Sequence, residues 1–396
     1  MLGEVLRAVT GKNYGPTIQK RILDPLGLAS SVPTITHDVR SRLAVGYGPL
    51  FDDRPWWPGR PLAPATWLEA DTADGSLCMT AADLATYLRM LLNEGDGPAG
   101  RLLSPNAFGL LTQRIAKTRG EESDFWYGYG VITGTQDGHR TIEHGGGMVG
   151  YFASMVGDMD LGIGVTALIN GPGSPLAYTL AALDLIRAEA EGRPVQLPEI
   201  ADPTETSTAS DYEGWYRAHD TDGLAGRPTA FLASTLGNRL SLQIEGETIE
   251  LRPSGDDSFV TAVPAFERFP LTFVRDADRI VGMMHGGAYY VKDSVPTPEF
   301  AAAPDEWLAF VGHYRSHNPW TTGFRVVLNR GRLWLILPAE PDGLELQQPL
   351  VPLGESWFRC GEDERIPERI RFDALIGGKA HRANLSLCDF YRVNTR

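Results

Sequence analysis

The stretch Arg140-Thr-Ile-Glu143-His144-Gly145-Gly146-Gly147-Met-Val-Gly150-Tyr-Phe-Ala-Ser154 decides the fold expected for the first half of this chain. The residues before His144 read as a strand, the glycines predict a turn, and a second strand begins at Tyr151. Further strands are predicted over Tyr127–Thr133 and Gly162–Ile169, each bounded by glycine or by charged turns. Consecutive strands joined by short turns indicate an antiparallel sheet.

Helices are predicted before and after these strands, and each has a start or stop signal. Thr80 and Ser104 are typical N-caps, and Pro105 suits the first helical position. Glycine after the last periodic residue ends a helix. The predicted helices cover Leu2–Gly11, a following segment that ends at Pro25-Leu26-Gly27-Leu28, Thr80–Leu92, a segment from Ser104, and Ala177–Ala190.

The second half of the chain contains an internal repeat. Tyr212-Glu-Gly214-Trp-Tyr216 matches Phe310-Val-Gly312-His-Tyr314, and further pairs follow at an offset of roughly a hundred residues. A period of that length makes each copy a domain rather than a solenoid unit. The strands of each copy are short and alternating, with no convincing helix, which favours a small antiparallel barrel. The further pairs are Leu240 with Leu333, Phe259 with Phe358, Phe273 with Phe372, and Tyr290 with Tyr391.

The expected organisation is therefore an α+β chain with three folded parts. Residues 1–190 form an antiparallel sheet with helices packed on it. Residues 191–210 carry Pro194, Pro198 and Pro203 and are predicted to be a linker. Two small antiparallel β-barrels follow at residues 211–297 and 304–396.

Four motifs in the first part occur in an order that resembles a known family. They are the amphipathic segment Leu2–Gly11, the segment Pro25–Leu28, Gly75-Ser-Leu-Cys-Met-Thr80, and His144-Gly145-Gly146. Together they resemble the penicillin-recognising serine hydrolases, which include class C β-lactamases, D-alanyl-D-alanine carboxypeptidases, esterases and D-aminopeptidases. The resemblance implies that residues 1–190 are the C-terminal part of a β-lactamase/transpeptidase-like domain. The two barrels resemble the layout of bacterial D-aminopeptidases.

The resemblance also implies a Ser-x-x-Lys motif and a Tyr-x-Asn or Ser-x-Asn motif, which would supply the nucleophile and its proton-transfer groups. No serine in the sequence is followed by lysine three residues later, and Tyr-x-Asn does not occur. Ser104-Pro-Asn106 and Ser316-His-Asn318 lie outside the expected place. We therefore expect a chain that is N-terminally truncated relative to the family, has no catalytic residue of its own and is inactive alone. The N-terminal half is one candidate partner.

His144, Gly145 and Gly146 match the third family motif and are the candidate substrate-binding residues. Histidine in place of lysine removes the fixed cation that would hold a β-lactam carboxylate, which favours the esterase or aminopeptidase branches. The implied substrate is a small molecule or peptide-like. The alternative interpretation of the motif is a turn histidine without a role. His285-Gly286-Gly287 repeats the motif inside the first barrel, without the flanking strands, and is interpreted as a chance match.

Two alternatives to a hydrolase stay open at this point. One is a non-catalytic binding or interaction protein built on the barrel repeats, and the other is a degenerate gene product. The Trp56-Trp57 loop either rims the substrate cleft or packs as an ordinary loop.

Composition excludes several other classes of function. The net charge of −14 repels nucleic acid and anionic membrane surfaces. No apolar run is long enough to span a membrane. His139 and His144 lie five residues apart across a turn without a completing ligand, so no metal site and no cofactor are expected. Cys78, Cys360 and Cys388 are expected to be small buried side chains, although Cys360 and Cys388 could pair. The compartment is left open.

Overall fold

The computed structural model describes residues 1–118, 122–198, 202–219, 227–338 and 347–394. The chain divides into two compact units, each of which is described by itself. The first unit is Met1–Gly48 with Leu62–Glu199, and the second is Pro49–Pro61 with Ile200–Arg396. The loop of residues 49–61 therefore belongs with the barrels rather than with the sequence that flanks it.

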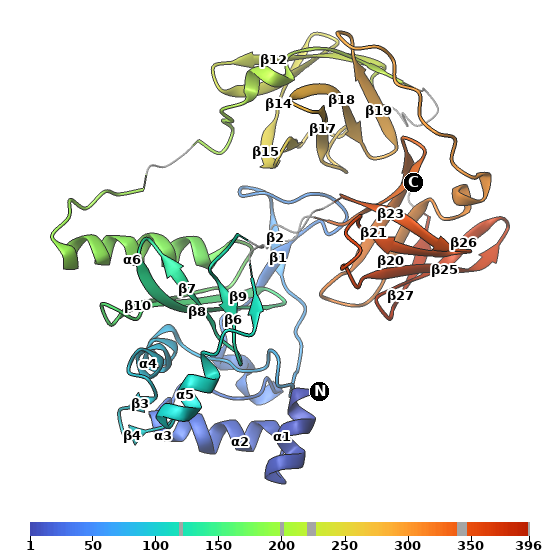
Figure 1. The fold of residues 1–396 in the computed structure, drawn as a ribbon. Helices are drawn as coiled ribbons and strands as arrows, with labels where there is room; N and C mark the ends of the chain where they lie inside the picture. The colour runs from blue at the N-terminus through green and yellow to red at the C-terminus, as the bar shows by residue number, and fades with distance from the viewer. Residues whose placement is uncertain (119–121, 199–201, 220–226, 339–346, 395–396) are drawn as a thin grey trace. The chain divides into compact units, whose positions relative to one another are not determined.

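A six-stranded antiparallel sheet forms the centre of the first unit (Figure 1). The prediction of an antiparallel sheet is confirmed. The predicted strand Tyr127–Thr133 is wrong in its middle, because Gly130 has a φ of 94° and the chain turns between two short strands. In sheet order the strands are β10 (Ile163–Ile169), β9 (Tyr151–Asp158), β8 (His139–Met148), β7 (Ile132–Gln136), β6 (Trp126–Tyr127) and β5 (Ala116–Lys117).

Two helices cover opposite faces of this sheet (Figure 1). Ser154 bonds to Thr179 of α6 at 2.9 Å. Gly157, three residues along β9, faces the other way and lies against Leu88 of α4. The helices are α1 (Leu2–Thr10), α2 (Tyr14–Ile18), the π-helical turn η1 (Gln19–Leu23), α3 (Asp24–Leu26), α4 (Ala81–Leu92), α5 (Pro105–Leu111) and α6 (Pro175–Glu191).

The helix signals seen in the sequence are confirmed where they can be checked. Thr80 caps α4 by accepting the Asp83 N–H, and Ser104 caps α5 by accepting the Ala107 N–H, both at 3.2 Å. Gly11 and Gly27 both have a φ of 68°, the left-handed conformation that ends a helix without a Cβ penalty. Three short paired or helical pieces complete the first unit: η2 (His37–Arg42), β1 (Tyr47–Pro49) with β2 (Leu62–Pro64), and β3 (Asp96–Gly97) with β4 (Gly100–Arg101).

The second unit contains the two predicted barrels. In the first, nine strands run from β14 round to β15, which are consecutive in the chain, so the sheet is nearly closed. Its elements are η3 (Ala209–Tyr212), β11 (Gly214–Ala218), β12 (Ala230–Leu236), β13 (Arg239–Ile244), β14 (Glu247–Glu250), β15 (Arg252–Gly255), β16 (Ser258–Val260), β17 (Leu271–Asp276), β18 (Arg279–His285) and β19 (Ala288–Lys292).

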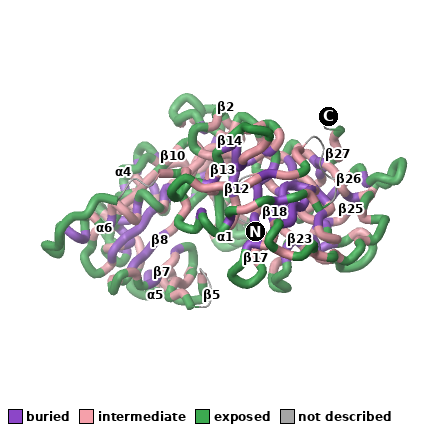
Figure 2. The backbone as a smooth tube through the Cα atoms, turned by 90° about the horizontal axis from the view of Figure 1, so that it is seen from above, coloured by how far each residue is buried: buried purple, intermediate pink, exposed green. Residues whose placement is uncertain are grey.

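The second barrel is closed, since β20 pairs with both β21 and β27. Buried residues line the inside of both barrels, and in the first unit they include residues 141–143 of β8 (Figure 2). The elements of the second barrel are η4 (Asp305–Ala309), β20 (Gly312–Arg315), β21 (Gly323–Asn329), β22 (Arg332–Ile336), β23 (Gln347–Gly354), β24 (Trp357–Cys360), β25 (Arg369–Ile376), β26 (Lys379–Leu385) and β27 (Cys388–Val393).

The repeat is visible in matched core contacts. The Tyr216 hydroxyl donates to the carbonyl of Tyr212, and the Tyr314 hydroxyl donates to that of Phe310, both at 2.8 Å. Each tyrosine lies in an aromatic cluster of its own barrel. One predicted pair is wrong. Tyr290 is fully buried and packs on Phe231, and in the second barrel Phe390 makes the matching contact with Phe324.

Tyr391 is 56% exposed, so the aromatic match at that position was one residue out of register. Alternation sends successive strand side chains to opposite faces, and only every second one enters the barrel.

The cysteines differ from one another in exposure. All three are free thiols: Cys78 is half-buried, Cys360 is buried and Cys388 is exposed. The expectation that all three are buried is therefore wrong for Cys388, which faces solvent at the start of β27. Cys360 and Cys388 do not pair. Burial raises the pKa of the Cys360 thiol to about 12, so it is inert at neutral pH.

The described helices include none that is both long and apolar enough to cross a membrane. Of the predicted linker, residues 199–201 lie outside the described residues. Beyond them, Asp202 pairs with Arg239, so the segment is attached to the first barrel before η3 begins.

Candidate functional site

Strand β8 carries all three candidate residues and extends past its neighbour β7. Pairing between β7 and β8 ends at Ile132 with Glu143, whereas pairing between β8 and β9 continues to Met148 with Tyr151. Within the described residues, one edge of β8 from His144 onward therefore has no strand partner. The predicted glycine turn is wrong in extent, because Gly145–Gly147 continue the strand and the chain turns only after Met148.

The three glycines leave this strand edge uncovered. Gly145, Gly146 and Gly147 are exposed, and none has a positive φ. A Cβ at Gly145 would lie 3.7 Å from the Ala153 carbonyl oxygen, and one at Gly146 would lie 3.9 Å from the Ala153 Cβ. Neither the backbone conformation nor packing therefore requires glycine here. What glycine provides is open access to the backbone N–H and C=O groups.

His144 is half-buried at the point where the edge becomes free. Its Nε2 lies 3.1 Å from the Tyr127 hydroxyl, and the two ring centroids are 5.9 Å apart. Tyr127 is the last residue of β6, is 38% exposed, and is brought to the site by the short β6–β7 hairpin. The pair places a hydroxyl and an imidazole beside the free backbone.

The sequence pattern predicts only a strand at Tyr127 and does not indicate its place in the site. The available signal was the run Trp126-Tyr127-Gly128-Tyr129-Gly130, since alternating aromatic and glycine residues are unusual in a buried strand. Tyr129 is 66% exposed, which fits a surface of contact rather than a core.

The Gly75 motif lies near the same end of β8. A Cβ on Gly75 would be 3.6 Å from the Met148 sulfur. The hydroxyl of Ser76 is fully buried and lies within hydrogen-bond distance of the carbonyls of Pro33 and Thr72, at 2.9 and 2.7 Å. This serine is therefore a structural hydrogen-bonding group and not a nucleophile.

The fold brings carboxylates to His139, which the sequence did not suggest. His139 and His144 lie on the same strand rather than across a turn, and a five-residue separation puts them on opposite faces. Donor atoms of His139, Asp158 and Asp160 lie within 4.8 Å of one another.

Their oxygens already accept protein donors. Asp158 accepts from Arg187 at 2.6 Å, and Asp160 accepts from Arg140 at 2.8 Å. The Oδ2 atom of Asp158 also lies 3.1 Å from Nδ1 of His139. The group is thus an ion-pair network that joins β8, β9 and α6.

His285 is a core residue of the first barrel. It is 1% exposed, its Nε2 lies 3.1 Å from the Phe266 carbonyl oxygen, and its ring packs edge-on against Phe266 and Phe269. Burial and the charge of Arg227 lower its pKa to about 3, so it stays neutral. The Trp56-Trp57 loop lies in the second unit, where Arg54 pairs with Glu267 and Arg60 lies over the Trp57 ring.

Residues 1–189 match the beta-lactamase family. The chain is 33% identical over 213 residues to a beta-lactamase-like protein of Homo sapiens, covering 50% of this chain and 39% of that protein. It is 27% identical over 214 residues to penicillin-binding protein 4 of Amycolatopsis lactamdurans, covering 51% of this chain and 52% of that protein. The chain therefore spans about half or less of the length of these relatives.

Among solved structures, the octameric penicillin-binding protein homologue from Pyrococcus abyssi is similar to 74% of this chain and 63% of its own length, with 23% identity and a TM-score of 0.44.

Proposed function

Residues 1–189 are a β-lactamase family domain, and on this premise we propose that the domain supplies the substrate-binding wall of a serine hydrolase. The proposed hydrolase is of the esterase, D-aminopeptidase or carboxypeptidase type. Its substrate is a small ester or a peptide-like amide, which lies along the free edge of β8 beside His144, Gly145 and Gly146.

The observation that carries this proposal is the free edge of β8 beyond Glu143. A peptide-like substrate can add to such an edge through main-chain hydrogen bonds, as an extra strand does. Glycines let its backbone approach closely. His144 and Tyr127 provide side-chain hydrogen bonds at the end of that edge.

Among these types, the side chains at the site favour the esterase and the D-aminopeptidase over the carboxypeptidase, whose substrate carries a free carboxylate. The family's third motif carries lysine in enzymes that bind such a carboxylate, and this chain has histidine there. An imidazole paired with a phenol can accept and donate hydrogen bonds but does not provide a permanent cation. An ester or an amide matches this environment better than a β-lactam acid.

Binding can be tested directly on the chain as it is. N-acetyl-D-alaninamide has an N–H and a C=O on each side of its Cα, which suits a strand edge. We expect ligand-observed saturation transfer to detect its binding. His144→Ala should weaken the affinity about threefold to tenfold, the loss expected for one hydrogen bond worth ~0.5–1.5 kcal/mol.

His381→Ala is the matched control, because His381 is exposed on β26 of the second barrel. It should leave the affinity unchanged. Equal effects of the two substitutions would contradict the proposal. His285→Ala is unsuitable as a control, since it would open a hole in the barrel core.

Hydrolysis is a separate expectation. No serine of the chain has a lysine three residues later, so we expect no turnover of nitrocefin or p-nitrophenyl acetate and no stoichiometric fluorophosphonate adduct. Without an activated nucleophile, only weak catalysis from binding groups remains. A serine adduct on this chain would contradict this expectation while leaving the binding proposal standing.

A further inference from the structure

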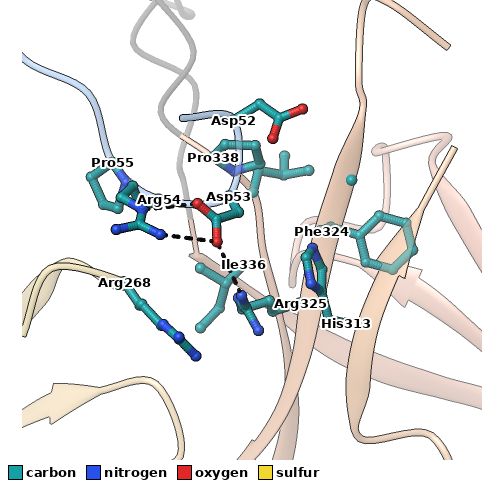
Figure 3. A pocket seen from close by; sticks show the side chains of 12 residues that line it. Asp52, Asp53, Arg54, Pro55, Arg268, His313, Phe324, Arg325, Ile336 and Pro338 are labelled. Atoms are coloured by element: carbon teal, nitrogen blue, oxygen red, sulfur yellow. Dashed lines mark hydrogen bonds and ion pairs between the residues drawn. The ribbon is translucent and has the colours of Figure 1, made fainter. Parts of the chain in front are cut away.

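Charged side chains gather round a small cavity in the second unit (Figure 3). The cavity has a volume of about 10 Å³, which is roughly the space of one water molecule. It lies between the loop of residues 49–61 and strands of the second barrel, with one arginine from the first barrel. Its charged and titratable lining residues are Asp52, Asp53, Arg54, Arg268, His313 and Arg325.

The hydrogen bonds to the two aspartates of this cluster come from arginines other than Arg325. Arg315 donates two hydrogen bonds to Asp52, at 3.0 and 2.6 Å. Asp53 accepts from Arg54 Nε at 2.8 Å. Arg325 forms an ion pair with Asp53, but the distance of 3.7 Å from its Nη2 to Asp53 Oδ2 is too long for a hydrogen bond.

Glu267 does not change this balance, because it accepts from Arg54 and lies 3.4 Å from Arg60. Figure 3 shows Asp53 between Arg54 and Arg325, with His313 on the far side of Arg325. Positive side chains therefore outnumber carboxylates in this cluster. The carboxylates are those of Asp52, Asp53 and Glu267, and the arginines paired with them are Arg54, Arg60, Arg315 and Arg325.

Among the described residues, Arg325 and His313 have buried side-chain nitrogens without a hydrogen-bond partner. The Arg325 side chain is 12% exposed, and its buried Nε and Nη2 have no hydrogen-bond partner in the part of the chain that the structure describes. His313 is 5% exposed, and its buried Nδ1 likewise has none among the described residues. Buried polar groups of this kind are costly unless they find a partner.

The electrostatics at the cavity point the same way. Burial lowers the pKa of the Arg325 guanidinium, Asp53 acts against this, and Arg268, Arg54 and Arg315 lower it further. Burial, together with Arg325 and Arg315, lowers the pKa of His313 to about 4. His313 is thus neutral at pH 7, and its imidazole N–H can donate without adding charge.

We propose that Arg325 and His313 form a binding site for one anionic oxygen of a carboxylate or phosphate group. The size of the cavity admits a single oxygen, so the rest of the ligand lies outside it. A guanidinium forms short, strong hydrogen bonds to such oxygens. Because Asp52, Asp53 and Arg54 come from the loop of residues 49–61, an anion bound here also steadies that loop against the barrels.

The test is thermal unfolding of the full chain at pH 7, with acetate or inorganic phosphate replacing chloride at constant ionic strength. A ligand that binds only the folded state stabilises it in proportion to the logarithm of its concentration above Kd. We expect a rise in the Tm of the second unit that grows with ligand concentration in this way. A response to acetate identifies a carboxylate ligand, and a response to phosphate alone identifies a phosphate ligand.

Arg325→Gln should abolish this rise, and Arg332→Gln should preserve it. Arg332→Gln is the matched control, because this substitution also removes one positive charge from the second barrel. Arg332 lies in an exposed ion pair with Glu362, away from the cavity lining. If Arg325→Gln does not fold, Arg325→Lys keeps the charge but loses the planar fork, and it should reduce the response. Equal rises in all variants, or none in the natural protein, would overturn the proposal.

Discussion

His285 shows how one buried residue gives the molecule a dependence on pH. Its pKa is about 3 in the folded chain, against about 6.5 in an unfolded one. Between pH 3 and pH 6.5, His285 is protonated in the unfolded chain and neutral in the folded chain. The contribution to stability is therefore complete above about pH 6.5 and is lost as the pH falls towards 3.

We predict that His285→Phe reduces the drop in Tm between pH 7 and pH 4.5. Phenylalanine keeps the ring against Phe266 and Phe269 but does not titrate. At pH 7 the variant should be less stable by about 1–3 kcal/mol, because the Phe266 carbonyl loses its partner. His381→Gln serves as the control, because His381 is exposed. If the Tm of His285→Phe depends on pH in the same way as the Tm of the natural protein, His285 does not have this role.

At the scale of elements, the β6–β7 hairpin sets the position of Tyr127. Gly128 follows Tyr127 directly, and a Cβ there would lie 2.3 Å from the backbone oxygen of Leu111. A backbone atom cannot move aside as a flexible side chain can. Gly128→Ala should therefore destabilise the first unit by about 1–3 kcal/mol, as other overpacked positions do, and should displace Tyr127 from His144.

Gly145→Ala provides the comparison in denaturant unfolding. Its Cβ would lie 3.7 Å from the nearest atom, so we expect a change of less than about 1 kcal/mol. Equal losses from the two substitutions would show that the hairpin adapts, and that glycine is not required beside Tyr127.

Element by element, the sequence was informative where its signals were local. The caps at Thr80 and Ser104 and the glycine stops at Gly11 and Gly27 were readable, because each depends on one side chain or one φ angle. The run Gly145–Gly147 was misread as a turn. Glycine is compatible with both conformations, and only pairing with β9 decides between them.

The candidate site divides in the same way. The His-Gly-Gly motif identifies His144 from the sequence alone. Its contact with Tyr127 depends on how three strands pair, and the spacing of the two residues in the sequence does not predict it. The carboxylates beside His139 were missed for the same reason, since Asp158 reaches it only through the β8–β9 register.

For the whole molecule, each barrel has a core built from its own residues. The core of the first barrel starts at Tyr212 and that of the second at Phe310, and neither includes a residue of the loop 49–61. That loop contributes ion pairs such as Arg54 with Glu267 and Asp52 with Arg315. Partly exposed pairs of this kind contribute little, typically about 0–1 kcal/mol each.

We therefore predict that a fragment of residues 202–396 is soluble and unfolds cooperatively, with a Tm within several degrees of the second unit in the full chain. Calorimetry of the fragment and of the full chain would check this. A fragment without a cooperative transition would show that the loop of residues 49–61 is essential to the barrels.

A substrate that lies along the free edge of β8 should change the environment of the backbone amides on that edge. This can be measured by titrating the isotope-labelled chain with N-acetyl-D-alaninamide and following the backbone amide signals. We expect saturable shifts concentrated at His144–Gly147 and at Tyr127, with the amides of the second barrel unchanged. Shifts that cluster elsewhere, with His144–Gly147 unaffected at saturation, would contradict this placement of the substrate.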